Sequence, residues 1–290
     1  MFKEKTYTLS KSLVAIDHIG SGGNAAVVRG FVGRKTPREI ALKLLDPRWV
    51  NADNMERDFK KFEHANLLKI EKWVNLSDLG FHHIPDWYSI ILNCEPKSFV
   101  SHPITDCCPN SDDWQRRPNF LSSQTTNDKT LAEFALSDFL ILIMEYCPMS
   151  LSDYIVRYSR SMQEVRRILT EVCAGLTIMH NGGITHSDLD IDNILMTSNG
   201  VAKIADFGSS KPLDKEGVME EIGDLGRLAF KLATGEELHE YDLMDPNEDI
   251  NSSNVPTNFV AICKKAVGND TGSFDTVDEF ADALKILRIR

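Results

Sequence analysis

The sequence lacks any hydrophobic run that could cross a membrane. Its longest strongly apolar stretch, residues 139–144, is far shorter than the roughly 20 residues that a transmembrane helix needs. The first 20 residues also lack the apolar core of a signal peptide, because lysines and polar residues interrupt them. These absences predict a cytoplasmic protein without a membrane partner.

Cysteine is scarce, and positive charge is outnumbered by negative charge. The six cysteines of the 290 residues follow no framework spacing, which favours reduced thiols over disulfides. The net charge of −11 argues against nucleic acid as a partner, because such a partner needs a positive field. A hydrophobic content of 42% is typical of a globular protein, and the length suffices for two lobes with separate cores.

Residues 186–193 concentrate three carboxylates, an imidazole and a carboxamide. Carboxylates this close repel one another unless water, hydrogen bonds or cations separate them. We therefore expect a positively charged partner, such as Mg²⁺, over this loop. The alternation of Asp188, Asp190 and Asp192 also suggests a calcium loop of the EF-hand type, which requires glycine at its sixth position and glutamate at its twelfth. Both of those positions are asparagine here, so the EF-hand interpretation fails.

A zinc site is a second metal hypothesis, and the spacing disfavours it. The candidate ligands match no paired pattern, and two adjacent cysteines fit one tetrahedron poorly. These ligands are His82, His83, Cys94, His102, Cys107 and Cys108.

Apolar periodicity predicts an α+β protein with strands mostly in the first half and helices mostly in the second. Strands are expected at 13–16, 26–30, 39–45, 65–70, 87–92 and 139–146, with a hairpin over 194–204. Helices are expected at 54–64, 150–158, 162–179, 220–234, 258–267 and 276–288. A joint near Cys147 divides the chain into residues 1–147 and 148–290. Residues 94–129 are rich in Pro and Ser and are predicted to form a long loop within an insertion at about 76–137.

Four motifs follow one another along the chain, and each is weak by itself. The glycine turn GSGGN at 20–24 could be a plain hairpin, and Lys43 could be a lysine that extends from an edge strand to water. HSDLDIDN at 186–193 and DFG at 206–208 follow. In this order they resemble the signature set of the protein kinase family. The resemblance implies a bilobal fold with a β-rich N-lobe and a helical C-lobe, and transfer of the ATP γ-phosphate to a Ser or Thr hydroxyl of a protein.

The resemblance also implies a role for each matching position. Asp188 would orient the substrate hydroxyl and accept its proton, and Asn193 and Asp206 would hold Mg²⁺. The expected nucleotide contacts are Gly20, Ser21 and Gly22 over the phosphates, Lys43 at the α and β phosphates, Val27, Ala41 and Leu195 around the adenine, and the backbone of Glu145 and Cys147 at its edge, behind Met144.

The chain departs from the family pattern next to these positions. Ser187 stands where an arginine is expected, so the usual clamp for an activation-loop phosphate is missing. Asp190 stands where Ser/Thr kinases carry lysine, and its negative charge should slow transfer unless it turns away or binds a cation. The helix glutamate that pairs with Lys43 is ambiguous. The spacing back from His64 places this glutamate at Met55. We take Glu56, one residue further along the chain, as the candidate.

The segment after the DFG motif is short, with about a dozen residues before the helix expected at Glu220. No Ala-Pro-Glu element is visible, and its arginine partner also looks absent, with Ser273 near that position. Two other functions therefore stay open: a pseudokinase that binds nucleotide and a partner, and a kinase-like phosphotransferase for small molecules. The insertion at about 76–137 is a candidate surface for a regulatory partner.

Overall fold

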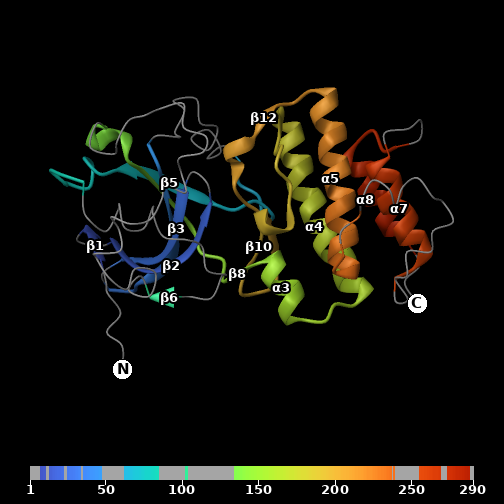
Figure 1. Cartoon of the computed structure of the whole chain (residues 1–290), viewed down its shortest axis with the longest axis horizontal. Coiled ribbons are helices and arrows are strands. Elements are labelled where there is room, and N and C mark those ends of the chain that lie inside the picture. Colours follow the sequence, from blue (N-terminus) through green and yellow to red (C-terminus); the bar gives the residue numbers. More distant parts are fainter. Residues whose placement is uncertain are drawn as a thin grey trace, which may run out of the picture. The chain divides into compact units, whose positions relative to one another are not determined.

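A computed structural model describes residues 7–10, 13–22, 25–33, 35–47, 62–84, 102–103, 134–236, 238, 255–268 and 273–287. Packing divides the chain into two compact units. Residues 1–60 and 69–146 form the first unit, here called the N-lobe, and residues 61–68 and 147–290 form the second, the C-lobe. The N-lobe is built on strands and the C-lobe mostly on helices (Figure 1), which confirms the predicted α+β class.

The N-lobe is one antiparallel sheet in the order β1-β2-β3-β4-β7-β5, with β6 paired to β2. Its strands are β1 (Tyr7–Ser10), β2 (Leu13–Gly22), β3 (Ala25–Val32), β4 (Arg38–Leu45), β5 (Ile70–Asn75), β6 (His102–Pro103) and β7 (Leu140–Glu145). The strands predicted around the glycine turn, at Lys43 and at 139–146 are confirmed. The continuous aliphatic run of β7 suits a central strand that is covered on both faces.

One face of this sheet carries the N-lobe core. Alternate residues of β3, β4 and β7 point to that face, because side chains along a strand alternate between the two faces. The fully buried members are Ala26, Val28, Ile40, Leu42, Leu44, Leu76, Phe139, Ile141 and Ile143. Leu76, Phe134 and Leu136 belong to this core or pack against it. Both described ends of the predicted insertion are thus part of the N-lobe packing.

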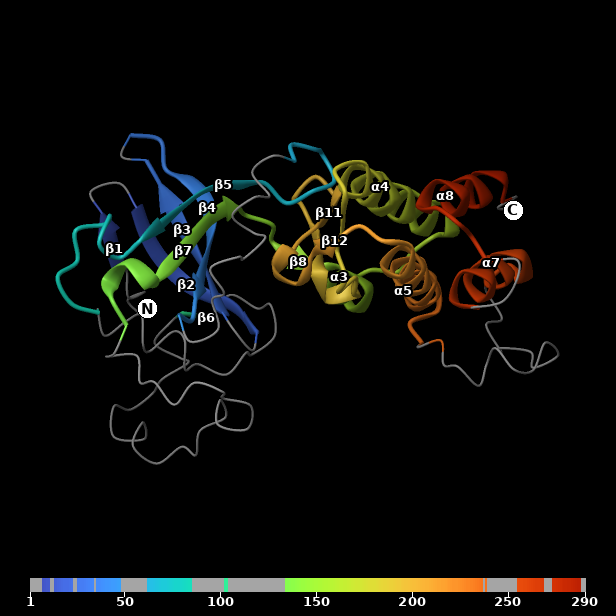
Figure 2. The ribbon, with the colours of Figure 1, turned by 90° about the horizontal axis from the view of Figure 1, so that it is seen from above.

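The C-lobe is organised around two 20-residue helices, α4 (Met162–Asn181) and α5 (Lys215–Thr234). Helix α8 (Val277–Ile286) packs against α4, and α7 (Thr257–Val267) packs against α5 (Figure 2). The remaining elements are β8 (Met149–Ser150), α3 (Leu151–Arg157), β9 (Ile184–Thr185), η6 (Ile191–Asn193), β10 (Ile194–Met196), β11 (Ala202–Ile204), η7 (Phe207–Ser209) and β12 (Lys211–Pro212). None of the described helices combines the length and apolar character needed to cross a bilayer.

Side-chain caps set the ends of the long helices. Ser161 accepts a hydrogen bond from the Glu164 N–H at the start of α4, and Gly182 ends that helix as the sequence predicts. Asp214 accepts a hydrogen bond from the Gly217 N–H, so α5 begins at Lys215. The prediction that this helix begins at Glu220 is therefore wrong, because apolar periodicity does not register the polar first turn that Asp214 caps. Only residues 209–214 separate Gly208 from α5.

The strand predicted at 65–70 is also displaced. Residues 65–66 form a turn, and the strand begins at Ile70. The Asn66 side chain is buried and donates to the Ala202 carbonyl oxygen at 3.0 Å, which holds this turn in the C-lobe. Of the helix predicted at 54–64, only 62–64 are described, and they are not helical. The strand predicted at 87–92, the loop at 94–129 and Glu56 lie outside the described residues.

Replacing Gly226 with alanine should destabilise the C-lobe. A Cβ at Gly226 would lie 2.7 Å from Ala266 Cβ and 2.9 Å from the Cys263 carbonyl oxygen, both on α7. Overpacking of this kind costs about 1–3 kcal/mol, more than the ~1 kcal/mol that alanine gains in a helix. We expect a net loss of about 1 kcal/mol or more in the free energy of unfolding, measured by urea denaturation.

Gly223 provides the matched control for this substitution. It is buried one turn earlier in the same helix, but its added Cβ would meet no atom closer than 3.5 Å. Gly223→Ala should therefore leave stability unchanged or raise it by up to about 1 kcal/mol. Equal effects of the two substitutions would contradict the packing argument.

Candidate active site

In the N-lobe, the predicted nucleotide contacts share one sheet face, opposite to the core. Lys43 of β4 lies between Val27 of β3 and Leu142 of β7, and Ala41 lies opposite Met144. Cross-strand partners, and residues two apart in one strand, lie on the same face. The register therefore brings Val27, Ala41 and Lys43 together, as the resemblance implies, with Met144 beside them.

The predicted glycine segment is the end of strand β2. Gly20 pairs with Val27, Ser21 with Ala26, and Gly22 with Ala25. Gly20 thus belongs to the same row of the sheet as Val27 and Lys43. A residue without a Cβ at this position lets the backbone approach a ligand closely, which is what a phosphate-covering loop requires.

The backbone N–H of Glu145 already makes a hydrogen bond within the N-lobe. Its N–H donates to the Lys69 carbonyl oxygen at 3.0 Å, and its carboxylate accepts from the Lys69 N–H at 2.6 Å. A contact from Glu145 to an adenine would therefore have to use its carbonyl oxygen. Cys147, the other predicted contact at this edge, is buried and is the first C-lobe residue after the joint.

In the C-lobe, Asn193 is the centre of the predicted catalytic loop. Its Nδ2 donates to the Asp188 carbonyl oxygen at 2.7 Å and to Asp188 Oδ2 at 3.1 Å. Its carbonyl oxygen accepts from the Ala205 N–H at 2.8 Å, directly before Asp206. Asp188 and Asn193 are thus bonded to each other, and the backbone brings Asp206 to the same loop.

Asp206 itself has a left-handed backbone, with φ 60° and ψ 65°. This conformation is uncommon for a residue other than glycine and persists only where surrounding contacts enforce it. His186 supplies such a contact: it is fully buried, its Nε2 lies 2.8 Å from the Ala205 carbonyl oxygen, and its ring packs edge-on against Phe207. The histidine therefore holds the residues on both sides of Asp206.

Glu221 anchors the catalytic loop, and sequence reasoning missed it. It lies on α5 with 1% exposure, and its Oε1 accepts from the backbone N–H groups of His186 at 2.6 Å and Ser187 at 3.2 Å. Its Oε2 bonds to Nε2 of His180. The signal was present in the sequence, because Glu221 shares the buried stripe of α5 with Leu225 and Leu228, where an acidic residue needs a partner.

The side chain of Ser187, in the position expected for arginine, contacts a residue close to it in the sequence. Its φ is 61°, and its Oγ lies 2.8 Å from the Thr185 hydroxyl. A side chain of this length serves the local backbone and does not reach out as an arginine clamp would. The missing phosphate clamp stays a prediction from the sequence.

The residues present fit a magnesium ion. Because the Asn193 amide nitrogen is directed at Asp188, its oxygen Oδ1 could serve as a metal ligand together with the Asp206 carboxylate. Within the described ranges, no three His, Cys, Asp or Glu side chains are grouped to hold a metal. Mg²⁺ takes one or two protein ligands together with phosphate oxygens and water, and Asn193 and Asp206 supply oxygens of that kind. Of the zinc candidates, only His82 and His83 have described side chains, and both are exposed.

The sequence was compared with known protein families. Residues 126–232 match the model of the protein kinase domain. This match contains the catalytic loop, the DFG motif and most of α5. This part of the chain is therefore similar to a protein kinase domain, as the order of the motifs implies.

Individual kinases also match parts of the chain. The Drosophila melanogaster serine/threonine-protein kinase Tao is 44% identical over 71 residues, which are 24% of this chain and 7% of Tao. The human NUAK family SNF1-like kinase 1 is 36% identical over 85 residues, 29% of this chain and 13% of that kinase. The probable serine/threonine-protein kinase RTK1 of Saccharomyces cerevisiae is 32% identical over 82 residues, 28% of this chain and 13% of RTK1. The matches thus span a small part of these relatives.

Leu195 completes the set of predicted positions in this kinase domain. It is half-buried in β10, paired with Ser150 of β8 and Lys203 of β11. The predicted site residues therefore form two groups, one on the N-lobe sheet and one around the C-lobe loop. The C-lobe group is tied together by hydrogen bonds, and the N-lobe group by strand register.

Proposed function

We propose that this kinase domain transfers the γ-phosphate of ATP to a hydroxyl group of a protein, with Ser or Thr favoured. The observation that carries the proposal is the bonding of Asn193 to Asp188 and to the residue before Asp206. This arrangement fixes one acid beside a substrate and another beside a cation. The names of the related kinases support Ser or Thr as the acceptor.

Each residue has a role in this proposal that follows from its chemistry. Asp188 is exposed at the loop, orients the hydroxyl and accepts its proton. Lys43 neutralises phosphate charge from the N-lobe sheet, next to Val27 and Ala41, which cover the adenine. Phosphoryl transfer depends mainly on position and charge, so a preorganised loop supplies most of what is needed.

Asn193 and Asp206 would hold Mg²⁺. When bound, the ion supplies charge neutralisation at the phosphates. The loop backbone contributes independently, because Glu221 binds two of its N–H groups and keeps the loop in one conformation. That conformation costs no reorganisation at the moment of reaction.

The short segment of residues 209–214 leaves little chain for a peptide-docking platform. We propose that the protein substrate, or a regulatory partner, is held elsewhere, with the insertion at about 76–137 as the candidate surface. The segment also supports activity that does not depend on phosphorylation of this loop, because Ser187 replaces the arginine that would read such a phosphate.

The test is transfer of label from γ-labelled ATP in the presence of Mg²⁺. The purified protein is incubated alone, with a generic protein substrate, with a cell lysate, and with a set of small metabolites. Label on protein that is lost in Asp206→Asn is the expected result. The melting temperature of Asp206→Asn is measured in parallel, to show that the variant is folded.

Two other outcomes would overturn the proposal. Nucleotide binding without transfer to any acceptor would favour a pseudokinase, and label confined to a small molecule would favour a small-molecule phosphotransferase. Both outcomes are read from the same incubations, since protein and metabolite products separate by size.

A further inference from the structure

Asp190 starts the one-turn helix η6 that ends at Asn193. Its Oδ1 accepts from the Asp192 N–H at 3.0 Å, and its carbonyl oxygen accepts from the Asn193 N–H, also at 3.0 Å. An aspartate at this position is a favourable helix cap, because it satisfies an N–H group that has no partner within the helix. The Asp190 carboxylate therefore caps the short helix that leads to Asn193.

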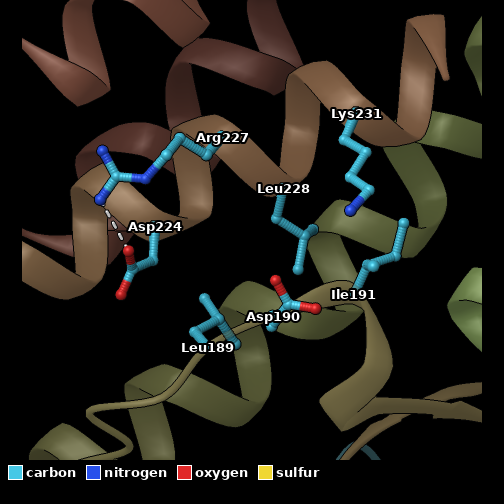
Figure 3. A pocket seen from close by; sticks show the side chains of 7 residues that line it. All are labelled: Leu189, Asp190, Ile191, Asp224, Arg227, Leu228 and Lys231. Carbon is cyan, nitrogen blue, oxygen red and sulfur yellow. Dashed lines mark hydrogen bonds and ion pairs between the residues drawn. The ribbon is translucent and has the colours of Figure 1, made fainter. Parts of the chain in front are cut away.

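The same carboxylate faces α5 across a small pocket of about 90 Å³. Figure 3 shows Asp190 directed toward Leu228, with Lys231 and the pair of Asp224 and Arg227 on the helix above it. The loop side of the pocket is completed by Leu189 and Ile191, which are buried. The apolar residues of the pocket thus come from both the loop and α5, and its other charged groups lie on α5.

The side chains that line this pocket carry charges of both signs. Arg227 donates to Asp224 at 2.7 Å, which pairs one cation of α5 with one acid of the same helix. Lys231, one turn further on, is the second cation, and Asp190 is the second acid of the lining. A lysine at position 190 would place three cations near a single carboxylate, and like charges at short distance repel.

Asp190 is the position at which the protein kinase resemblance implies a lysine that favours transfer. Its direction toward α5 gives a physical reason for the exchange, because the carboxylate caps η6 and faces the helix. We propose that Asp190 is a positioning residue, which holds Asn193 by capping η6 and by its charge complementarity to Lys231 of α5. The proposal rests on the proposed kinase function for its activity test and on packing alone for its stability test.

Three substitutions separate the cap from the charge. Asp190→Asn keeps a capping oxygen and removes the charge, and we expect kcat to fall no more than about twofold. Asp190→Ala removes both, with an expected fall of about fivefold. Asp190→Lys also reverses the charge, with an expected fall of about tenfold or more and a raised Mg²⁺ requirement, since Asn193 is displaced.

The charge argument is tested by a swap. Lys231→Glu alone should lower activity, and Lys231→Glu combined with Asp190→Lys should recover at least about threefold over Asp190→Lys alone, because opposite charges again face each other. Asp192→Lys is the matched control: it makes the same charge change two residues away, on an exposed residue outside the pocket lining. Its kcat should change less than about twofold.

The same variants are compared by melting temperature without nucleotide. The double variant should melt at a higher temperature than the two single effects predict, which is a result independent of activity. Transfer by Asp190→Lys at or above the wild-type rate would overturn the proposal and leave the kinase function intact. If the wild-type protein transfers no phosphate, the proposed kinase function fails. The melting temperatures of the single and double variants then decide on the positioning role of Asp190. Additive effects of the two substitutions would overturn it.

Discussion

Asp188→Asn should lower phosphate transfer by about 10²–10⁴-fold while nucleotide binding is kept. The substitution removes the group that accepts the proton of the substrate hydroxyl. It preserves the shape of the side chain and an oxygen that can still accept from Asn193 Nδ2, which lies 3.1 Å from Oδ2. The measurement is the initial rate with labelled ATP, together with a direct nucleotide titration.

Stability provides the control for this prediction. Asp188 is exposed, so its replacement should change the free energy of unfolding by less than about 0.5 kcal/mol. Asp192→Asn, also exposed and four residues away, should keep close to full activity. A variant Asp188→Asn that retains more than a tenth of the wild-type rate would remove Asp188 from the role of base.

Glu221→Ala should cost about 3–5 kcal/mol of stability, because it removes one partner of a buried, hydrogen-bonded charge. The backbone N–H groups of His186 and Ser187 would lose their acceptor, and His180 would lose its carboxylate partner. Transfer should be lost as well, since the loop that carries Asp188 is anchored by these bonds. Urea denaturation and the labelled-ATP assay measure the two effects.

The neighbouring residue Glu220 is the natural control for Glu221. It is exposed on the same helix, and Glu220→Ala should change stability by less than about 0.5 kcal/mol. Glu221→Gln keeps the volume and one acceptor oxygen, so it should fold better than Glu221→Ala and recover part of the activity. If Glu221→Ala matched the wild-type protein in both assays, the anchor would have no function.

The local elements followed from residues close together in the sequence. Alternation and aliphatic runs predict β3, β4 and β7, because a strand's pattern records which of its faces is buried. The pairing of Asn193 with Asp188 could also be expected, since five residues of a tight loop bring the two together. The start of α5 could not, because its first turn is polar and only the Asp214 cap marks it.

By itself the sequence determined the α+β class and the resemblance to protein kinases, and it predicted the site residues Lys43, Asp188, Asn193 and Asp206, because these depend on motifs and local periodicity. Only the tertiary structure decided what holds the catalytic loop. Glu221 is 34 residues from Ser187, and Asp190 meets α5 only once the chain has folded back. Such contacts depend on how helices pack, and no short-range pattern records that. The aspartate in place of lysine, which suggested a weakened catalyst, therefore has a structural role in this fold.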